Sequence, residues 1–152
     1  MIIVTGGAGF IGSNIVKGLN KRGIEDILIL DQASTDMNLS NLFNLKTSDY
    51  IDHAEFHQNL INGRIPNDIQ AVIHQGACSN TMSVDANEMM KTNFCFSKDL
   101  LYSCIKSEVP LIYASSAAIY GVGTSFSVDP QDEAPLNIYA YSKYLFDRLV
   151  RK

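Results

Sequence analysis

The sequence has little of what marks specialised protein classes. Its three cysteines, Cys78, Cys95 and Cys104, are an odd number without a CxxC pair, which argues against a disulfide framework and a zinc site. No apolar run is long enough to span a bilayer, and no basic cluster accompanies the net charge of −4, so we expect neither a membrane nor a nucleic acid as partner. The apolar run at residues 2–4 is too short for a secretory signal. These absences favour the reducing cytoplasm and a cytoplasmic protein.

Length and composition fit one globular domain. The chain has 152 residues, of which 46% are hydrophobic and 18% charged, and a chain of this size can bury about 70% of its unfolded surface. It contains no internal repeat and no low-complexity segment. We therefore expect residues 1–152 to form a single compact core.

Short buried strands alternate with amphipathic helices. Apolar runs predict strands at residues 2–5, 27–31, 71–74 and 110–116, and periodic apolar positions predict helices at residues 10–22, 52–62, 84–107 and 137–152. The polar segments 32–49 and 121–135 read as loops, the first with at most one short strand. This order predicts an α/β fold, a Rossmann-like doubly wound parallel sheet. The last helix lacks a stop signal, so we expect the chain to end inside it.

A glycine-rich turn follows the first predicted strand. Gly6, Gly9 and Gly12 recur every three residues, a spacing that permits a tight turn, close approach to a pyrophosphate, and close packing of helix on sheet. The helix that follows offers free N–H groups to an anion, and Phe10 and Ile11 would lie beside the diphosphate through their backbone. The alternative is a glycine-rich turn without a ligand.

Asp31 ends the second predicted strand. A carboxylate there can accept hydrogen bonds from the adenosine ribose of NAD and would repel the 2′-phosphate of NADP. No Lys or Arg occurs at residues 30–45, so this region offers no cation for NADP. The alternative is a solvated acid in a turn.

Ser116, Tyr139 and Lys143 form the candidate catalytic set. Ser116 ends a predicted parallel strand, where open α/β sheets bind ligands. Tyr139 and Lys143 are four residues apart, so both can project from one helix face. An ammonium group beside a phenol makes the phenol more acidic, while Ser116 would donate to the reacting oxygen. The alternative is a pair of ordinary surface residues; Tyr141 lies on a different face.

Four further side chains could suggest a site. His74 at a strand end is interpreted as a buried, hydrogen-bonded histidine. His53 and His57 share a helix face without a third ligand, so we expect a solvated face rather than a metal site. Cys78 is expected to line the cofactor pocket as an unreactive packing residue.

These motifs together resemble the extended short-chain dehydrogenase/reductase superfamily, whose nucleotide-sugar members share the GxxGxxG turn, the Ser-Tyr-Lys set and a two-domain build. Within it the chain is similar to the ADP-glyceromanno-heptose 6-epimerases. The similarity covers essentially the whole chain, and Gly76-Ala77-Cys78-Ser79 is its most telling segment. The matching segments are residues 1–5, 12–17, 74–79, 113–118 and 135–139, and Gly76–Ser79 lies within the third of them.

The resemblance implies an epimerisation for lipopolysaccharide core biosynthesis. The cofactor takes hydride from C6 of ADP-heptose and returns it to the other face. Tyr139 would be an acid/base, Lys143 would support it and contact the cofactor, and Ser116 would stabilise the oxygen. The resemblance also implies a homo-oligomer, with a second catalytic lysine and the sugar-binding domain beyond residue 152. The implied cofactor contacts are Phe10, Ile11, Asp31, Gln32, Gln75, Gly76, Ala77, Cys78, Ser79 and Asn93.

Coenzyme and substrate stay open at this point. The family usually uses NADP and carries basic residues where this chain has Asn38 and His53, whereas Asp31 favours NAD. The other hypotheses are an epimerase or dehydratase acting on UDP-galactose or dTDP-glucose, and a non-catalytic dinucleotide-binding module.

Overall fold

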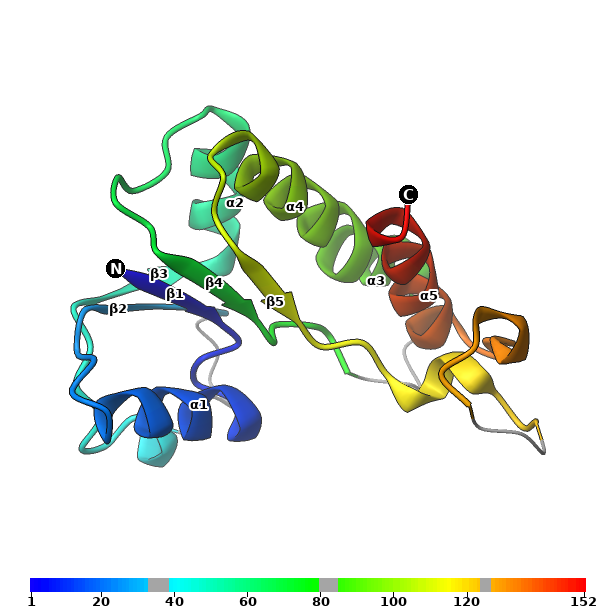
Figure 1. Cartoon of the computed structure of the whole chain (residues 1–152), viewed down its shortest axis with the longest axis horizontal. Coiled ribbons are helices and arrows are strands. Elements are labelled where there is room, and N and C mark those ends of the chain that lie inside the picture. The colour runs from blue at the N-terminus through cyan, green and yellow to red at the C-terminus, as the bar shows by residue number, and fades with distance from the viewer. Residues whose placement is uncertain (33–38, 80–84, 124–126) are drawn as a thin grey trace. The chain divides into compact units, whose positions relative to one another are not determined.

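The computed structural model describes residues 1–32, 39–79, 85–123 and 127–152 (Figure 1). The chain divides into two compact units. The first unit comprises residues 1–76 and 99–114, and the second comprises residues 77–98 and 115–152.

A parallel sheet forms the centre of the first unit. Its described strands follow the spatial order β3-β2-β1-β4-β5, and every neighbouring pair is parallel. This order confirms the predicted Rossmann-like fold. Strands β2 and β3 are added on one side of β1 and strands β4 and β5 on the other, so the strand order reverses between β1 and β4. Sheets of this kind bind ligands at the point of reversal. The strands are β1 (Ile2–Thr5), β2 (Ile27–Asp31), β3 (Asp49–Asp52), β4 (Ala71–His74) and β5 (Leu111–Tyr113).

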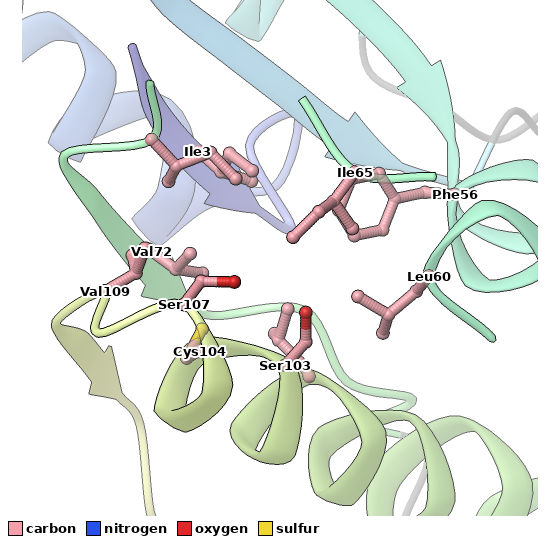
Figure 2. Close-up of a pocket in the computed structure, with 11 residues that line it drawn as sticks. Ile3, Phe56, Leu60, Ile65, Val72, Ser103, Cys104, Ser107 and Val109 are labelled. Carbon is pink, nitrogen blue, oxygen red and sulfur yellow. The ribbon is translucent and has the colours of Figure 1, made fainter. Parts of the chain in front are cut away.

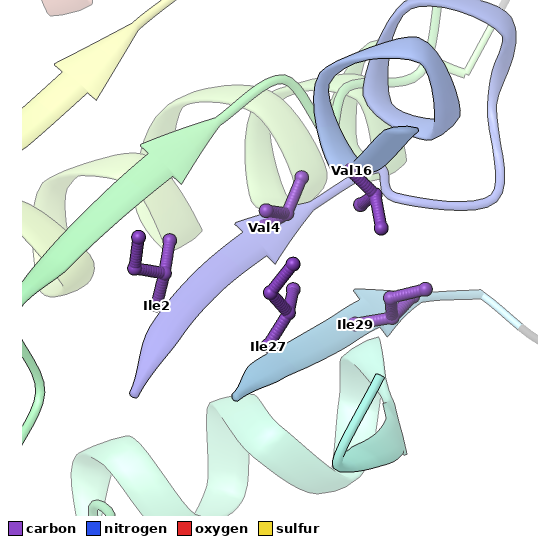
Figure 3. Close-up of a cluster of buried hydrophobic side chains, with 5 residues drawn as sticks. All are labelled: Ile2, Val4, Val16, Ile27 and Ile29. Carbon is purple, nitrogen blue, oxygen red and sulfur yellow. The ribbon is translucent and has the colours of Figure 1, made fainter. Parts of the chain in front are cut away.

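Helices cover both faces of this sheet, because successive side chains of each buried strand point to opposite faces. On one face, helix α1 (Phe10–Asn20) places Val16 against Ile2 and Val4 of β1 and Ile27 and Ile29 of β2 (Figure 3). On the other face, a small apolar cavity is lined by Ile3 of β1, by helix α2 (His53–Ile61) and by the end of helix α4 (Phe96–Lys106) (Figure 2). Its wall includes Phe56, Leu60, Val72, Leu100 and Cys104.

The observed elements differ from the predicted ones at the sheet edges. Strand β3 was not predicted at these residues, because it lacks a continuous apolar run. Within the described chain it pairs only with β2. Strand β5 ends at Tyr113, three residues earlier than predicted. In α2, Ile61 is 60% exposed and does not join the apolar face with Phe56 and Leu60.

The long helix predicted at residues 84–107 is interrupted. It consists of α3 (Ala86–Met90), the π-helical turn η2 (Lys91–Cys95) and α4; Val84 lies outside the described residues. A π-turn inserts a residue and rotates the side chains that follow, and it often occurs at a functional site.

Helix α5 (Ile138–Val150) organises the second unit. Asn137 caps it by accepting a hydrogen bond from the Ala140 N–H at 2.8 Å, and α5 packs against α3, η2 and the 3₁₀ turn η3 (Ala117–Tyr120). A second 3₁₀ turn, η4 (Pro130–Asp132), lies in the segment predicted as a loop. The first unit also contains the 3₁₀ turn η1 (Leu39–Asn41). Of the helices described, none has the length and apolar character to cross a membrane.

Candidate functional site

The glycine turn between β1 and α1 requires glycine at two positions. Gly6 has a φ of +66°, and a Cβ there would lie 2.7 Å from the backbone nitrogen of Gly76. A Cβ on Gly12 would lie 2.0 Å from the Gly6 carbonyl oxygen. A Cβ on Gly9 would meet only that oxygen, at 3.2 Å, so its outer side is open. The approach of a pyrophosphate to Gly9 stays a prediction.

The amino end of α1 is exposed beside this turn. Gly9 is its N-cap and provides no side-chain hydrogen bond, so the first N–H groups of the helix keep their capacity to bind an anion. The side chains of Phe10 and Ile11 are 79% and 60% exposed. These features suit the backbone contact predicted for both residues.

Asp31 braces the glycine turn. Its Oδ2 accepts a hydrogen bond from the Ala8 N–H at 2.8 Å, and its Oδ1 accepts one from the Gln32 N–H at 2.8 Å. Asp31 is therefore not the solvated turn acid of the alternative interpretation. Each carboxylate oxygen can accept a second hydrogen bond, so contact with a ribose stays a prediction for Asp31 and for the exposed Gln32.

Tyr50 packs behind Asp31. Its hydroxyl donates to the Asp31 backbone carbonyl at 3.1 Å. Burial raises the pKa of Tyr50, with further contributions from the charges of Asp31 and Asp52. The phenol therefore stays protonated and keeps donating this hydrogen bond at neutral pH.

A polar pocket lies on the α1 side of the turn, and Lys17, which was not predicted as a site residue, lines part of it. Asn41 is on its wall, and its side-chain Nδ2 donates to the Ala8 carbonyl at 2.9 Å. Lys17 reaches the same pocket from α1. Lys17 lies outside residues 30–45, which contain no Lys or Arg, so this cation was not predicted. Asn38 lies outside the described residues. The full lining is Ser13, Asn14, Lys17, Ser40, Asn41, Phe43, Asn44 and Leu45.

The end of β4 is fixed by a hydroxyl from β1. Thr5 Oγ1 accepts the Gly76 N–H at 2.9 Å and lies 2.6 Å from Nδ1 of His74. His74 is 2% exposed, so the prediction of a buried, hydrogen-bonded histidine is confirmed. The arrangement positions Gln75 and Gly76 beside Gly6.

The second unit contains Ser116, Tyr139 and Lys143. Ser116 is not at a strand end as predicted: it caps η3, and its Oγ accepts a hydrogen bond from the Ala118 N–H at 3.2 Å. Tyr139 is half-buried and Lys143 only 5% exposed, so Lys143 is not an ordinary surface residue. Tyr141 is 44% exposed, in agreement with its predicted place on another face. Ser116 is the N-cap of η3, and η3 packs against α5, the helix that carries Tyr139 and Lys143.

Burial changes the acidity of Lys143. Desolvation lowers its pKa, and the negative charge of Asp147 partly opposes this effect. A lowered pKa is typical of a lysine that exchanges or steers protons. The catalytic roles of Ser116, Tyr139 and Lys143 stay predictions.

Asn93 joins three segments of the second unit. Its Oδ1 accepts from the Cys78 N–H at 2.8 Å, and its Nδ2 lies 3.0 Å from the Cys78 carbonyl oxygen and 3.2 Å from Ser142 Oγ. The Ser142 hydroxyl in turn donates to the Tyr139 carbonyl at 2.7 Å. Asn93 is 1% exposed. Its side chain therefore fixes the 77–79 segment and the Tyr139 turn, which spacing in the sequence did not indicate.

The two histidines of α2 do not form the solvated face that we expected. His57 is partly buried, and its Nε2 lies 2.9 Å from Asp99 Oδ2 of α4. Its ring centroid is 6.3 Å from that of His53. No cluster of three or more potential metal ligands occurs in the described part of the chain.

The fold is similar to that of several solved nucleotide-sugar enzymes. The ADP-L-glycero-D-manno-heptose-6-epimerase of Helicobacter pylori superposes with a TM-score of 0.86 at 30% identity, over 99% of this chain and 50% of that one. UDP-glucose 4-epimerase of Thermotoga maritima, solved with UDP-glucose, gives 0.82 at 28% identity over the same shares. A dTDP-glucose 4,6-dehydratase double mutant of Streptomyces venezuelae, solved with NAD, gives 0.80 at 25% identity, again over 99% and 50%.

The chain thus spans about half the length of these relatives. The resemblance to heptose 6-epimerases that the sequence motifs indicated is confirmed at the level of structure. Residues 2–152 also match a family described as the NAD dependent epimerase/dehydratase family. Because this match covers nearly the whole chain, the protein belongs to the NAD dependent epimerase/dehydratase family.

Proposed function

We propose that the chain is the cofactor-binding part of a nucleotide-sugar epimerase that acts on ADP-D-glycero-D-manno-heptose. The observation that carries this proposal is Lys143, which is 5% exposed and lies one helical turn after Tyr139. A lysine on an ordinary surface helix would stay exposed to water. Burial at this spacing is explained instead by a role beside an acid/base tyrosine. Membership of the epimerase/dehydratase family supports the same interpretation.

The first unit would bind the dinucleotide. The open side of Gly9 and the exposed N–H groups of α1 fit a pyrophosphate, and the remaining lone pairs of Asp31 and the exposed Gln32 fit a ribose. A nicotinamide cofactor, when bound, supplies a hydride acceptor and later a hydride donor. The segment at residues 75–79 would contact the same cofactor, held from one side by Thr5.

The second unit would move the proton. Tyr139, as a phenolate, accepts the proton of the sugar hydroxyl while the hydride leaves the same carbon, which gives a ketone. Lys143 as an ammonium group favours the phenolate, and the Ser116 hydroxyl donates a hydrogen bond to the reacting oxygen. Tyr139 would return the proton to the same oxygen when hydride is restored from the opposite face, which would give the C6 epimer without net oxidation.

ADP-heptose is preferred as substrate because the epimerase of Helicobacter pylori is 30% identical over 99% of the chain. That substrate would place the enzyme in lipopolysaccharide core biosynthesis in the cytoplasm, and we expect a homo-oligomer. The similarity to the UDP-glucose epimerase and the dTDP-glucose dehydratase supports a second candidate, an enzyme acting on another nucleotide sugar. NADP by family habit and NAD by the presence of Asp31 are both proposed as coenzymes.

The test is a substrate panel with purified protein that includes the proposed sugar-binding domain, and with added NADP or NAD. We expect NMR spectra to show conversion of ADP-D-glycero-D-manno-heptose to its C6 epimer, with UDP-glucose and dTDP-glucose unchanged. Tyr139→Phe should lower the rate by about 10²–10⁴-fold, and Tyr141→Phe is the matched control that should retain it. Conversion of another sugar would favour the second candidate. Full activity of Tyr139→Phe would contradict the proposed role of Tyr139.

A further inference from the structure

Asp147 is a buried carboxylate to which the proposed reaction assigns no role. It lies on α5 and is 5% exposed. Its Oδ2 accepts a hydrogen bond from the Ser115 hydroxyl. Its Oδ1 is fully buried and has no hydrogen-bond partner within the described chain. A buried oxygen without a hydrogen bond is destabilising, and more so when it is charged, so a compensating interaction is expected.

Lys143 is the group placed to compensate Asp147. The two residues are four apart on α5, so their side chains lie on the same face of the helix, and both are 5% exposed. Tyr139 is one turn earlier on that face. The three residues therefore form a line of phenol, ammonium group and carboxylate along one helix.

Other ionisable groups on the elements packed against α5 are less suited to this role. Glu88 of α3 and Lys91 of η2 are exposed, so water screens their charges. Cys95 of η2 and Tyr120 of η3 are half-buried, and neither of them is a carboxylate or a cation. Asp147 is the carboxylate whose charge opposes the effect of burial on the pKa of Lys143.

We propose that Asp147 is a positioning residue that keeps the buried Lys143 in its charged form. Burial alone favours the neutral amine, and a neutral amine would not favour ionisation of Tyr139. Asp147 thus acts on the acid/base residue through Lys143, without touching the substrate. The link to Tyr139 rests on the proposed function, whereas the link between Asp147 and Lys143 does not.

A purely structural role makes a different prediction. In that case Asp147 would act only through its hydrogen bond with Ser115, and loss of either partner would have the same effect. Ser115→Ala removes the hydrogen bond and keeps the carboxylate. Asp147→Asn keeps the size of the side chain and removes its charge. The two variants therefore separate charge from hydrogen bonding.

The experiment is an NMR titration of the 152-residue chain labelled with ¹³C at the ε carbon of lysine, with the Lys143 signal assigned by its loss in Lys143→Arg. The midpoint for Lys143 should be lower in Asp147→Asn than in the unmodified chain, because a nearby opposite charge typically accounts for about 1–3 pKa units. In Ser115→Ala it should stay near the unmodified value. Equal midpoints in the two variants, or an unchanged midpoint in Asp147→Asn, would overturn the proposal.

A second measurement covers the case in which Asp147→Asn does not fold. In the unmodified chain labelled at the aspartate carboxyl carbons, the Lys143 signal should show a step at the pH at which the Asp147 carboxyl titrates. Absence of that step would also overturn the proposal. Neither measurement needs cofactor or substrate, so failure of the proposed function would show separately in the substrate panel.

Discussion

Two glycines of the same helix should respond in opposite directions to substitution by alanine. Gly12 and Gly18 both lie in α1. A Cβ on Gly12 would lie 2.0 Å from the Gly6 carbonyl oxygen, whereas the nearest atom to a Cβ on Gly18 is the Arg22 guanidinium nitrogen at 3.9 Å. Gly12→Ala must therefore push the helix away from the turn, and Gly18→Ala meets open space.

The magnitudes follow from two opposing effects. Alanine stabilises a helix interior by about 0.5–1 kcal/mol relative to glycine, and this gain applies to both positions. Overpacking costs about 1–3 kcal/mol, and it applies only to Gly12. We therefore expect the free energy of unfolding to rise in Gly18→Ala by about 0.5–1 kcal/mol and to lie about 1–3 kcal/mol lower in Gly12→Ala than in Gly18→Ala.

Urea denaturation of the two variants and the unmodified chain, followed by circular dichroism, measures this difference. For a chain of this size, 1 kcal/mol corresponds to about 2–4 °C in Tm, so thermal melts provide an independent check. Equal stabilisation of both alanine variants would contradict this prediction, because the close contact between Gly12 and Gly6 would then not affect the free energy of unfolding.

Three further predictions concern other parts of the chain. Asn93→Leu leaves the backbone N–H and C=O of Cys78 without their partner, so it should lower the free energy of unfolding by about 2–4 kcal/mol in urea denaturation; an unchanged value would contradict the bridging role. If the polar pocket that Lys17 lines binds the 2′-phosphate of NADP, Lys17→Gln should weaken NADP binding about fivefold in calorimetry, as expected for an exposed charge, and leave NAD binding unchanged. Lys21→Gln is the control, and equal losses for both coenzymes would exclude the polar pocket as a 2′-phosphate site. Burial raises the pKa of Cys104 to about 11, so about one thiol in a thousand is ionised at pH 8; Ellman's reagent should label Cys104 only after denaturation, and rapid labelling of the native chain would contradict this.

The sequence predicted the central strands because their environment is uniform. Strands β1, β2 and β4 have the predicted bounds, since a strand buried on both faces reads as a continuous apolar run. Strand β3 was missed because its two ends are aspartates and only Tyr50 and Ile51 are apolar. Edge strands need only one buried side, so their pattern resembles that of a loop.

The candidate site divides in the same way. The glycine turn, Asp31 and the Tyr139–Lys143 spacing are local patterns that a sequence displays directly. The partners that fix them are distant: Thr5 and His74 are 69 residues apart, Asn93 and Ser142 are 49, and Ser115 and Asp147 are 32. Such pairings depend on the folded chain. Asp147 alone carried a readable signal, its spacing of four residues after Lys143.

The proposed function depends first on binding of a nicotinamide dinucleotide at the glycine turn. Calorimetric titration of NADP and NAD into the 152-residue chain tests it directly, with Gly9→Asp as control. That variant should fold, because a Cβ at Gly9 meets only one atom, at 3.2 Å, and its carboxylate should repel the pyrophosphate. We predict binding of at least one coenzyme that is lost in Gly9→Asp. Absence of binding to both, or equal binding by Gly9→Asp, would contradict the account.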